Sequence, residues 1–147
     1  MPSAEHTVTI NRPLDDVFAF VADKDNDPRW RPGVAEIARV SGEGGGASYR
    51  QVMNGPMGRK IPADFEITRY EVGKRIDFRT TAGPVQPSGR FNFVEADGAT
   101  RLTFALEAQL DGAKKLMAPM VSRSMRSEVE NLDRLKQILE GDSTPSS

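Results

Sequence analysis

Few side chains in this sequence have the chemistry and spacing that proton transfer requires. Tyr49 and Gln51 stand two positions apart, so on a β-strand their hydroxyl and amide groups would share one face and could enter a binding pocket. His6 is the single histidine and shares a predicted strand face with Val8 and Ile10. We treat Tyr49, Gln51 and His6 as catalytic candidates, but a structural role explains each of them equally well or better.

The standard motifs of metal, nucleotide and nucleophilic chemistry are absent from the sequence. It contains no cysteine, which excludes disulfides, zinc–thiolate sites, iron–sulfur clusters and cysteine nucleophiles. No GxSxG, HExxH, Walker or dinucleotide-binding motif occurs. The glycine-rich segment Gly42–Gly46 lacks the lysine and the following helix of a phosphate-binding loop, so it predicts a flexible turn. We expect no cofactor and no metal, and the sequence leaves open whether the protein is an enzyme.

Length and composition indicate one domain, residues 1–141, followed by a flexible tail, residues 142–147. The chain has 147 residues, and its hydrophobic fraction of 37% and charged fraction of 28% exclude both a disordered chain and a membrane protein. The net charge of −1 offers no broad basic field, so we expect no nucleic-acid partner. Because the N-terminus is not signal-like and no apolar run approaches about 18 residues, we expect a cytoplasmic location.

Seven segments have the alternating pattern and the β-branched or aromatic content of strands. Turn signals such as Asp97-Gly98 separate them. They are Glu5–Ile10, Val34–Val40, Ala47–Met53, Arg59–Val72, Arg75–Ala82, Ser88–Glu95 and Thr100–Leu110. Pro62 in the fourth segment predicts an edge position or a bulge. Short connections favour an antiparallel meander whose apolar face another element has to cover.

A long amphipathic helix, Leu116–Glu140, is the element that can cover this face. Its apolar residues recur every three or four positions, and Pro119 fits the first turn. About 22 helical residues at roughly 1.5 Å each reach about 33 Å, enough to cross a small domain. Nearer the N-terminus, a short helix is predicted after Pro13, and a turn or second short helix within Asp23–Pro32.

Three stretches carry a resemblance to a known superfamily. They are INRPLDDVFAFVAD at Ile10–Asp23, DPRWRPGV at Asp27–Val34 and the closing segment LMAPMVSRSMRSEVENLDRLKQILE. In this order they resemble START-like, or SRPBCC, proteins, in particular the polyketide cyclase/dehydrase and lipid-transport branch. The resemblance implies an α+β helix-grip fold: a seven-stranded antiparallel sheet, two short helices and one long C-terminal helix. It also implies a cavity for an apolar ligand between the sheet and the last helix, while only some members catalyse a reaction.

The apolar strand faces and the long helix predict where such a ligand would lie. Methionines gather in the first half of the helix and leucines in the second, so the first half is expected to be the adaptable, ligand-facing part. The candidate ligand-contacting residues are Trp30, Tyr49, Met53, Phe65, Phe78, Phe91, Phe93, Phe104, Met117, Met120, Val121 and Met125. At any one of these positions, simple core packing is the stronger interpretation. A ligand burying roughly 300 Å² of apolar surface would gain about 7 kcal/mol before the costs of association.

We therefore expect a protein that binds or transports a small hydrophobic ligand, with polyketide cyclase/dehydrase-type catalysis in the same cavity as the alternative. Basic residues on the long helix, such as Lys114 and Arg123, could instead contact an anionic membrane or a nucleic acid. Acidic neighbours such as Glu130 favour a solvated helix face. The sequence does not fix the ligand or the oligomeric state, and a homodimer is compatible with it.

Overall fold

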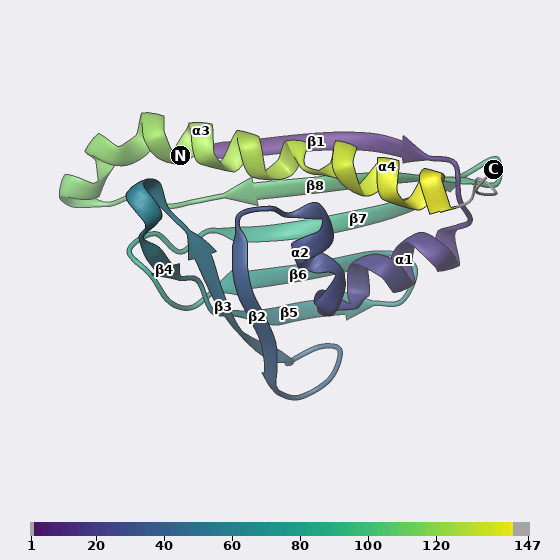
Figure 1. The fold of residues 1–147 in the computed structure, drawn as a ribbon, viewed down its shortest axis with the longest axis horizontal. Helices are drawn as coiled ribbons and strands as arrows, with labels where there is room; N and C mark the ends of the chain where they lie inside the picture. Colours follow the sequence, from purple (N-terminus) through teal and green to yellow (C-terminus); the bar gives the residue numbers. More distant parts are fainter. Residues whose placement is uncertain (1, 143–147) are drawn as a thin grey trace.

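An antiparallel sheet curves around one long helical segment, and the computed structural model describes residues 2–142 of this arrangement (Figure 1). In this part of the chain the sheet has eight strands: β1 Ser3–Ile10, β2 Val34–Ser41, β3 Ser48–Asn54, β4 Lys60–Pro62, β5 Phe65–Glu71, β6 Arg75–Thr80, β7 Ser88–Ala96 and β8 Ala99–Glu107. Neighbours pair in the order β1-β8-β7-β6-β5-β3-β2, and the short β4 pairs with β3. The first strand thus lies beside the last, with every pairing antiparallel.

The strands follow the predicted pattern with one main difference. The predicted segment Arg59–Val72 forms two strands, β4 and β5, so the sheet gains a short strand beyond the seven predicted. The pairing of β3 with β4 ends at Pro62, whose nitrogen cannot donate a hydrogen bond. The following residue, Ala63, donates its N–H to the Gln51 carbonyl oxygen at 2.8 Å, and the chain then continues into β5.

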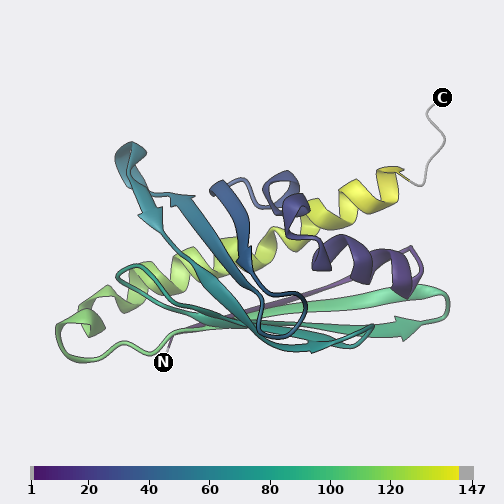
Figure 2. The same cartoon turned by 90° about the horizontal axis from the view of Figure 1, so that it is seen from below.

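The main helices lie on one face of the sheet (Figure 2). They are α1 Leu14–Ala22, η1 Lys24–Asn26, α2 Asp27–Trp30, η3 Gly112–Met117, α3 Ala118–Glu130 and α4 Leu132–Asp142, where η denotes a 3-10 helix. A further single turn, η2 Pro56–Gly58, leads into β4. The helices predicted near the N-terminus therefore form as α1 and as the pair η1 and α2.

The long helix predicted over Leu116–Glu140 is divided in the structure. It begins as η3, becomes α-helical at Ala118 and breaks at Asn131. At the break, the Asn131 N–H donates to the Glu128 carbonyl oxygen at 3.1 Å, a tighter turn than an α-helix makes. Both α3 and α4 present apolar residues to the same core, so the apolar periodicity in the sequence does not mark the break. The predicted tail lies outside the described residues except for Asp142, which ends α4.

The core centres on Trp30, which α2 places completely buried between the helices and the sheet. Its indole ring meets the rings of Phe91 and Phe104 edge-on, at centroid distances of 6.2 and 6.0 Å. The last helix completes this core with the buried side chains of Leu132, Leu135 and Leu139.

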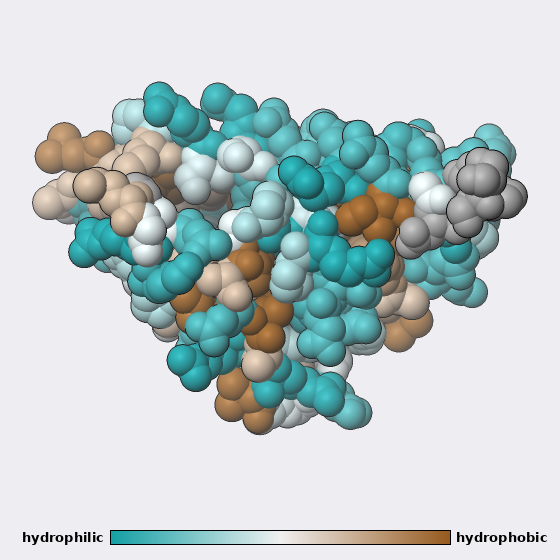
Figure 3. Space-filling model, viewed as in Figure 1, coloured by the Kyte–Doolittle hydropathy of each residue, from teal (hydrophilic) through white to brown (hydrophobic). Residues whose placement is uncertain are grey.

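The two halves of the helical segment differ in exposure. Seen from the helix side, the molecule is largely hydrophilic, but apolar side chains gather at the end where η3 leads into α3 (Figure 3). Leu116 is 87% exposed and Met120 is 55% exposed, whereas Val121 and Met125 are buried. Both halves therefore contribute buried side chains to the core, and the exposed apolar side chains lie at the start of the segment.

This difference predicts unequal costs of truncation along the helical segment. Leu135→Ala removes a completely buried side chain and should lower the free energy of unfolding by about 2–5 kcal/mol. Met120→Ala, at a mostly exposed position, should change it by less than about 0.5 kcal/mol. Urea denaturation of both variants measures the two values. Equal losses would contradict the difference in burial between these two positions.

Candidate functional site

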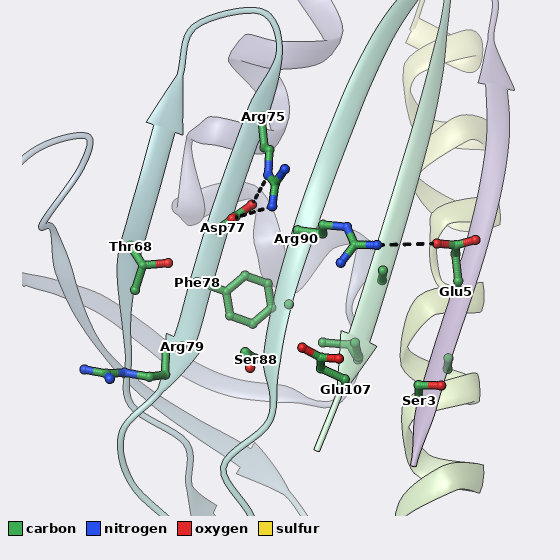
Figure 4. A pocket seen from close by; sticks show the side chains of 14 residues that line it. Ser3, Glu5, Thr68, Arg75, Asp77, Phe78, Arg79, Ser88, Arg90 and Glu107 are labelled. Atoms are coloured by element: carbon green, nitrogen blue, oxygen red, sulfur yellow. Dashed lines mark hydrogen bonds and ion pairs between the residues drawn. The ribbon is translucent and has the colours of Figure 1, made fainter. Parts of the chain in front are cut away.

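A groove of about 650 Å³ lies on the outer face of the sheet (Figure 4). Its charged residues alternate along the strands with buried ones such as Ile76 and Phe91, so they face away from the helices. They pair with one another: Arg75 contacts Asp77 at 2.7 and 2.9 Å, and Arg90 reaches Glu5 at 3.9 Å. Such balanced, solvent-facing ion pairs are ordinary on the outer face of a half-buried sheet.

A smaller cavity lies inside the fold, and we call it the inner cavity. Its volume is about 230 Å³, and it lies between the end of α1, η1 and the inner faces of β3, β5 and β6, with the β2–β3 turn at its rim. This space equals roughly eight water volumes at about 30 Å³ each, which suits a molecule built on one or two rings. The lining residues are Ala22, Lys24, Arg39, Glu43, Gly44, Tyr49, Ile67, Tyr70 and Ile76.

Lys24 is the buried charged residue of this lining. Its side chain is 5% exposed, and Nζ lies 3.9 Å from Asp27 Oδ2 and 4.9 Å from the centre of the Phe91 ring. Burial lowers the pKa of Lys24; the charge of Asp27 opposes this effect and that of Arg31 adds to it. The amine therefore loses its proton more readily than an exposed lysine does.

Beside Lys24, a buried guanidinium joins three elements, and we call this contact the Arg31 junction. Arg31 follows α2 and donates through Nη1 to Asp27 Oδ2 at 2.9 Å and to Gln51 Oε1 of β3 at 3.0 Å. Its Nε donates to Glu128 Oε1 of α3 at 2.5 Å. Although burial acts in the opposite direction, Glu128 and Asp27 raise the pKa of Arg31, so the guanidinium remains charged. The junction thus ties α2 to both the sheet and the last helical segment.

Two buried polar atoms next to the Arg31 junction have no hydrogen-bond partner among residues 2–142. They are Asp27 Oδ1 and the indole Nε1 of Trp30, both on α2. Buried polar atoms are usually paired, so exceptions often mark the position of a water or a ligand. Of the two residues, Asp27 is the one that lies beside Lys24, with Oδ2 3.9 Å from Nζ.

The structure separates the three catalytic candidates. Tyr49 lines the inner cavity, its ring stacks on Phe65 at 4.9 Å, and burial raises the pKa of its hydroxyl, with Arg39 opposing. Gln51 Oε1 accepts a hydrogen bond from Arg31 Nη1, and Gln51 Nε2 donates one to the Ala63 carbonyl oxygen at 3.1 Å. Both ends of this amide are therefore engaged in structural hydrogen bonds. His6 contacts Asp133 of α4 through Nε2 at 2.8 Å and does not line the inner cavity.

The predicted ligand-contacting residues fall into three groups. Tyr49 alone lines the inner cavity, and its stacking partner Phe65 continues into a cluster of rings with Phe78, Phe91, Phe104 and Trp30. Phe93 packs on Phe18 at 4.9 Å, and Met53 Sδ lies 3.9 Å from Arg31 Nη2. Met117, Met120, Val121 and Met125 line neither cavity, so a ligand at that end stays a prediction.

Sequence reasoning missed Lys24, Ala22, Tyr70 and the turn residues of the lining. Lys24 lies in the polar run DKDND, which is typical of an exposed turn, and no spacing signal marks it as buried. The sequence does predict Ile67 and Ile76 on the buried face of the sheet, because both alternate with polar residues along their strands.

Comparison with known proteins gives a family match and a set of similar folds. The model of the family described as polyketide cyclase / dehydrase and lipid transport matches residues 1–140. No curated protein sequence matches the chain. No helix among residues 2–142 combines the length and the apolar composition needed to cross a bilayer.

Three solved structures illustrate the shared fold. TTHA0849 from Thermus thermophilus superposes with a TM-score of 0.82 at 22% identity, over 97% of this chain and 100% of that chain. A START superfamily protein from Mycobacterium smegmatis gives a TM-score of 0.75 at 17% identity, over 95% and 97%. The di-domain ARO/CYC StfQ from the steffimycin biosynthetic pathway gives 0.79 at 17% identity, over 97% of this chain and 51% of that chain. The predicted α+β, START-like fold is confirmed.

The Arg31 junction predicts a large loss of stability when its cation is removed. Arg31→Met leaves the buried Asp27 and the partly buried Glu128 without their shared partner and should lower the free energy of unfolding by about 3–5 kcal/mol. The same change at Arg39, in an exposed pair with Glu43, should cost less than about 1 kcal/mol. Chemical denaturation compares the two variants, and similar losses would contradict a special role for the buried pair.

The lowered pKa of Lys24 predicts a pH-dependent stability. Between the lowered folded-state pKa and the ordinary value of 10.5, the unfolded chain binds more protons than the folded one, so raising the pH stabilises the fold. Lys24→Met removes this dependence. The free energy of unfolding of the wild type, relative to this variant, should therefore increase from neutral pH to about pH 10. Lys74→Met, at an exposed lysine, serves as the control; a flat difference for Lys24→Met would contradict the shift.

Proposed function

The chain belongs to the polyketide cyclase/dehydrase and lipid-transport family, and on this premise we propose that it binds or carries a small hydrophobic molecule in the inner cavity. The observation that carries the proposal is the enclosure of this space by the apolar side chains of Ile67 and Ile76 and the rings of Tyr49 and Tyr70. The lining thus combines apolar and aromatic side chains with several polar groups, and a small-molecule site uses such polar groups to orient its ligand.

The polar groups of the lining support a ligand with one oxygen-bearing end. The hydroxyl groups of Tyr49 and Tyr70 and the amine of Lys24 can hydrogen-bond to it while the remaining walls contact its ring or chain. Arg39 and Glu43 lie 3.8 Å apart and mostly exposed at the rim, where such a pair is weak and easily rearranged. A ligand can therefore enter beside the β2–β3 turn without disturbing the core.

Catalysis of the cyclase/dehydrase type is the second candidate function. It is supported by the placement of Tyr49 and Lys24 in one cavity, because groups with shifted pKa values in a cavity are candidates for acid–base work. Turnover of a poly-β-ketone that is lost in Tyr49→Phe, with folding intact, would support it. The Gln51→Ala variant is less informative because Gln51 is engaged in the Arg31 junction. A cytoplasmic location and a homodimer remain predictions from the sequence.

Binding in the inner cavity predicts a position-specific effect of adding a ring. Ala22→Phe places a ring in the cavity wall and should weaken the binding of 2-naphthol, measured by calorimetry, at least about tenfold, or 1.4 kcal/mol. Ala19→Phe, on the exposed side of the same helix, should leave the affinity unchanged.

A third variant distinguishes the inner cavity from the methionine-rich end of α3. Val121→Trp should leave 2-naphthol binding unchanged if the ligand occupies the inner cavity. Loss of binding in Val121→Trp, with Ala22→Phe unaffected, would move the site to the Met117–Met125 region. Absence of binding by the wild type to any of a panel of small apolar ligands below the millimolar range would contradict the proposed function.

A further inference from the structure

We propose that Lys24 is a nucleophilic amine that captures a small aldehyde in the inner cavity by forming an imine. This inference rests on the proposed function, because the aldehyde has to enter the same space. It goes beyond that function by naming the chemical class of the ligand, a one-ring carbonyl compound, and the atom of the protein that reacts with it.

The first support is the position of the amine. Lys24 lines the inner cavity with its side chain 5% exposed, and no hydrogen bond to Nζ occurs among the described residues. Its contacts are the ring face of Phe91 at 4.9 Å and Asp27 Oδ2 at 3.9 Å. A buried ammonium normally has several acceptors for its three N–H groups, so this amine is poorly satisfied as a cation.

The second support is the competition for Asp27. Its Oδ2 atom accepts a hydrogen bond from Arg31 Nη1 at 2.9 Å, a full ångström closer than Lys24 Nζ. The carboxylate is therefore already engaged by a cation that keeps its proton, and it offers Lys24 a longer, weaker contact. The nearby guanidinium also disfavours a second positive charge, and burial acts in the same direction. Desolvation and a neighbouring cation are the two features that activate lysines for attack on carbonyl carbons.

The reaction balances without any further reagent. The lone pair of the neutral amine forms a bond to the carbonyl carbon, and the carbonyl oxygen takes a proton to give a carbinolamine. Loss of that oxygen as water, with the second amine proton, leaves a C=N bond between Nζ and the former carbonyl carbon. The hydroxyl of Tyr49 lines the same cavity and keeps its proton, so it can donate a hydrogen bond to the carbonyl oxygen during attack.

Benzaldehyde with sodium cyanoborohydride tests the proposal on the full-length protein. Hydride addition to the imine fixes one benzyl group on the lysine, and peptide mass spectrometry locates it. Lys24 should be labelled roughly tenfold or more faster than the other lysines, Lys60, Lys74, Lys114, Lys115 and Lys136. Lys24→Met should abolish the fast labelling, and the matched Lys74→Met variant should retain it.

Benzyl alcohol separates this inference from the proposed function, because it has the same ring but no carbonyl carbon. It should slow the labelling of Lys24 by competition and should bind the wild type and the Lys74→Met variant alike. If benzyl alcohol binds but labelling is spread evenly over the exposed lysines, imine formation is wrong and the binding function stands. If neither compound binds and Lys24 is not labelled, both proposals fail. Locating the benzylated lysines in the wild-type protein decides the outcome even if Lys24→Met folds poorly.

Discussion

The burial of one guanidinium constrains the rest of this fold. Arg31 is held between the sheet and the helices, and a cation in that position is tolerable only if several acceptors surround it. Asp27, Gln51 and Glu128 supply them from α2, β3 and α3. Each acceptor connects its own element to Arg31. This one side chain therefore links the last helical segment to the sheet.

The same arrangement shapes the inner cavity. Trp30 fills the centre of the core against Phe91 and Phe104, and the residues just before it leave a space bounded by Ala22 and Lys24 on one side and the strands on the other. Hydrogen-bond partners are distributed unevenly around α2. Arg31 has several acceptors, whereas Lys24 Nζ, Asp27 Oδ1 and Trp30 Nε1 have no hydrogen bond among the described residues. The stabilising ion pairs and the proposed reactive amine are thus adjacent within residues 24–31.

The sequence predicted the fold better than the site, for a physical reason. Alternation in strands and three-to-four spacing in helices depend on one buried face, and segments such as Arg75–Ala82 and Leu132–Leu139 show it clearly. The pairing end at Pro62 was signalled by proline, whereas the break at Asn131 was hidden by continuous apolar spacing. Lys24 could not be found in this way, because its burial depends on Phe91 and Asp27 in the assembled structure and not on its neighbours in the chain. Tyr49 lines the inner cavity because strand alternation places it on the inner face, and its contact with a ligand stays a prediction.

The break at Asn131 bears on how the helical segment can move. It lies three residues after Glu128, so the helical segment changes geometry directly beside its ion pair with Arg31. On the far side of the break, Leu132 and Leu135 anchor α4 in the core. Any swing of α3 away from the sheet would pivot at Asn131 and would first have to separate Glu128 from Arg31. That single contact would then hold α3 in one position against the sheet.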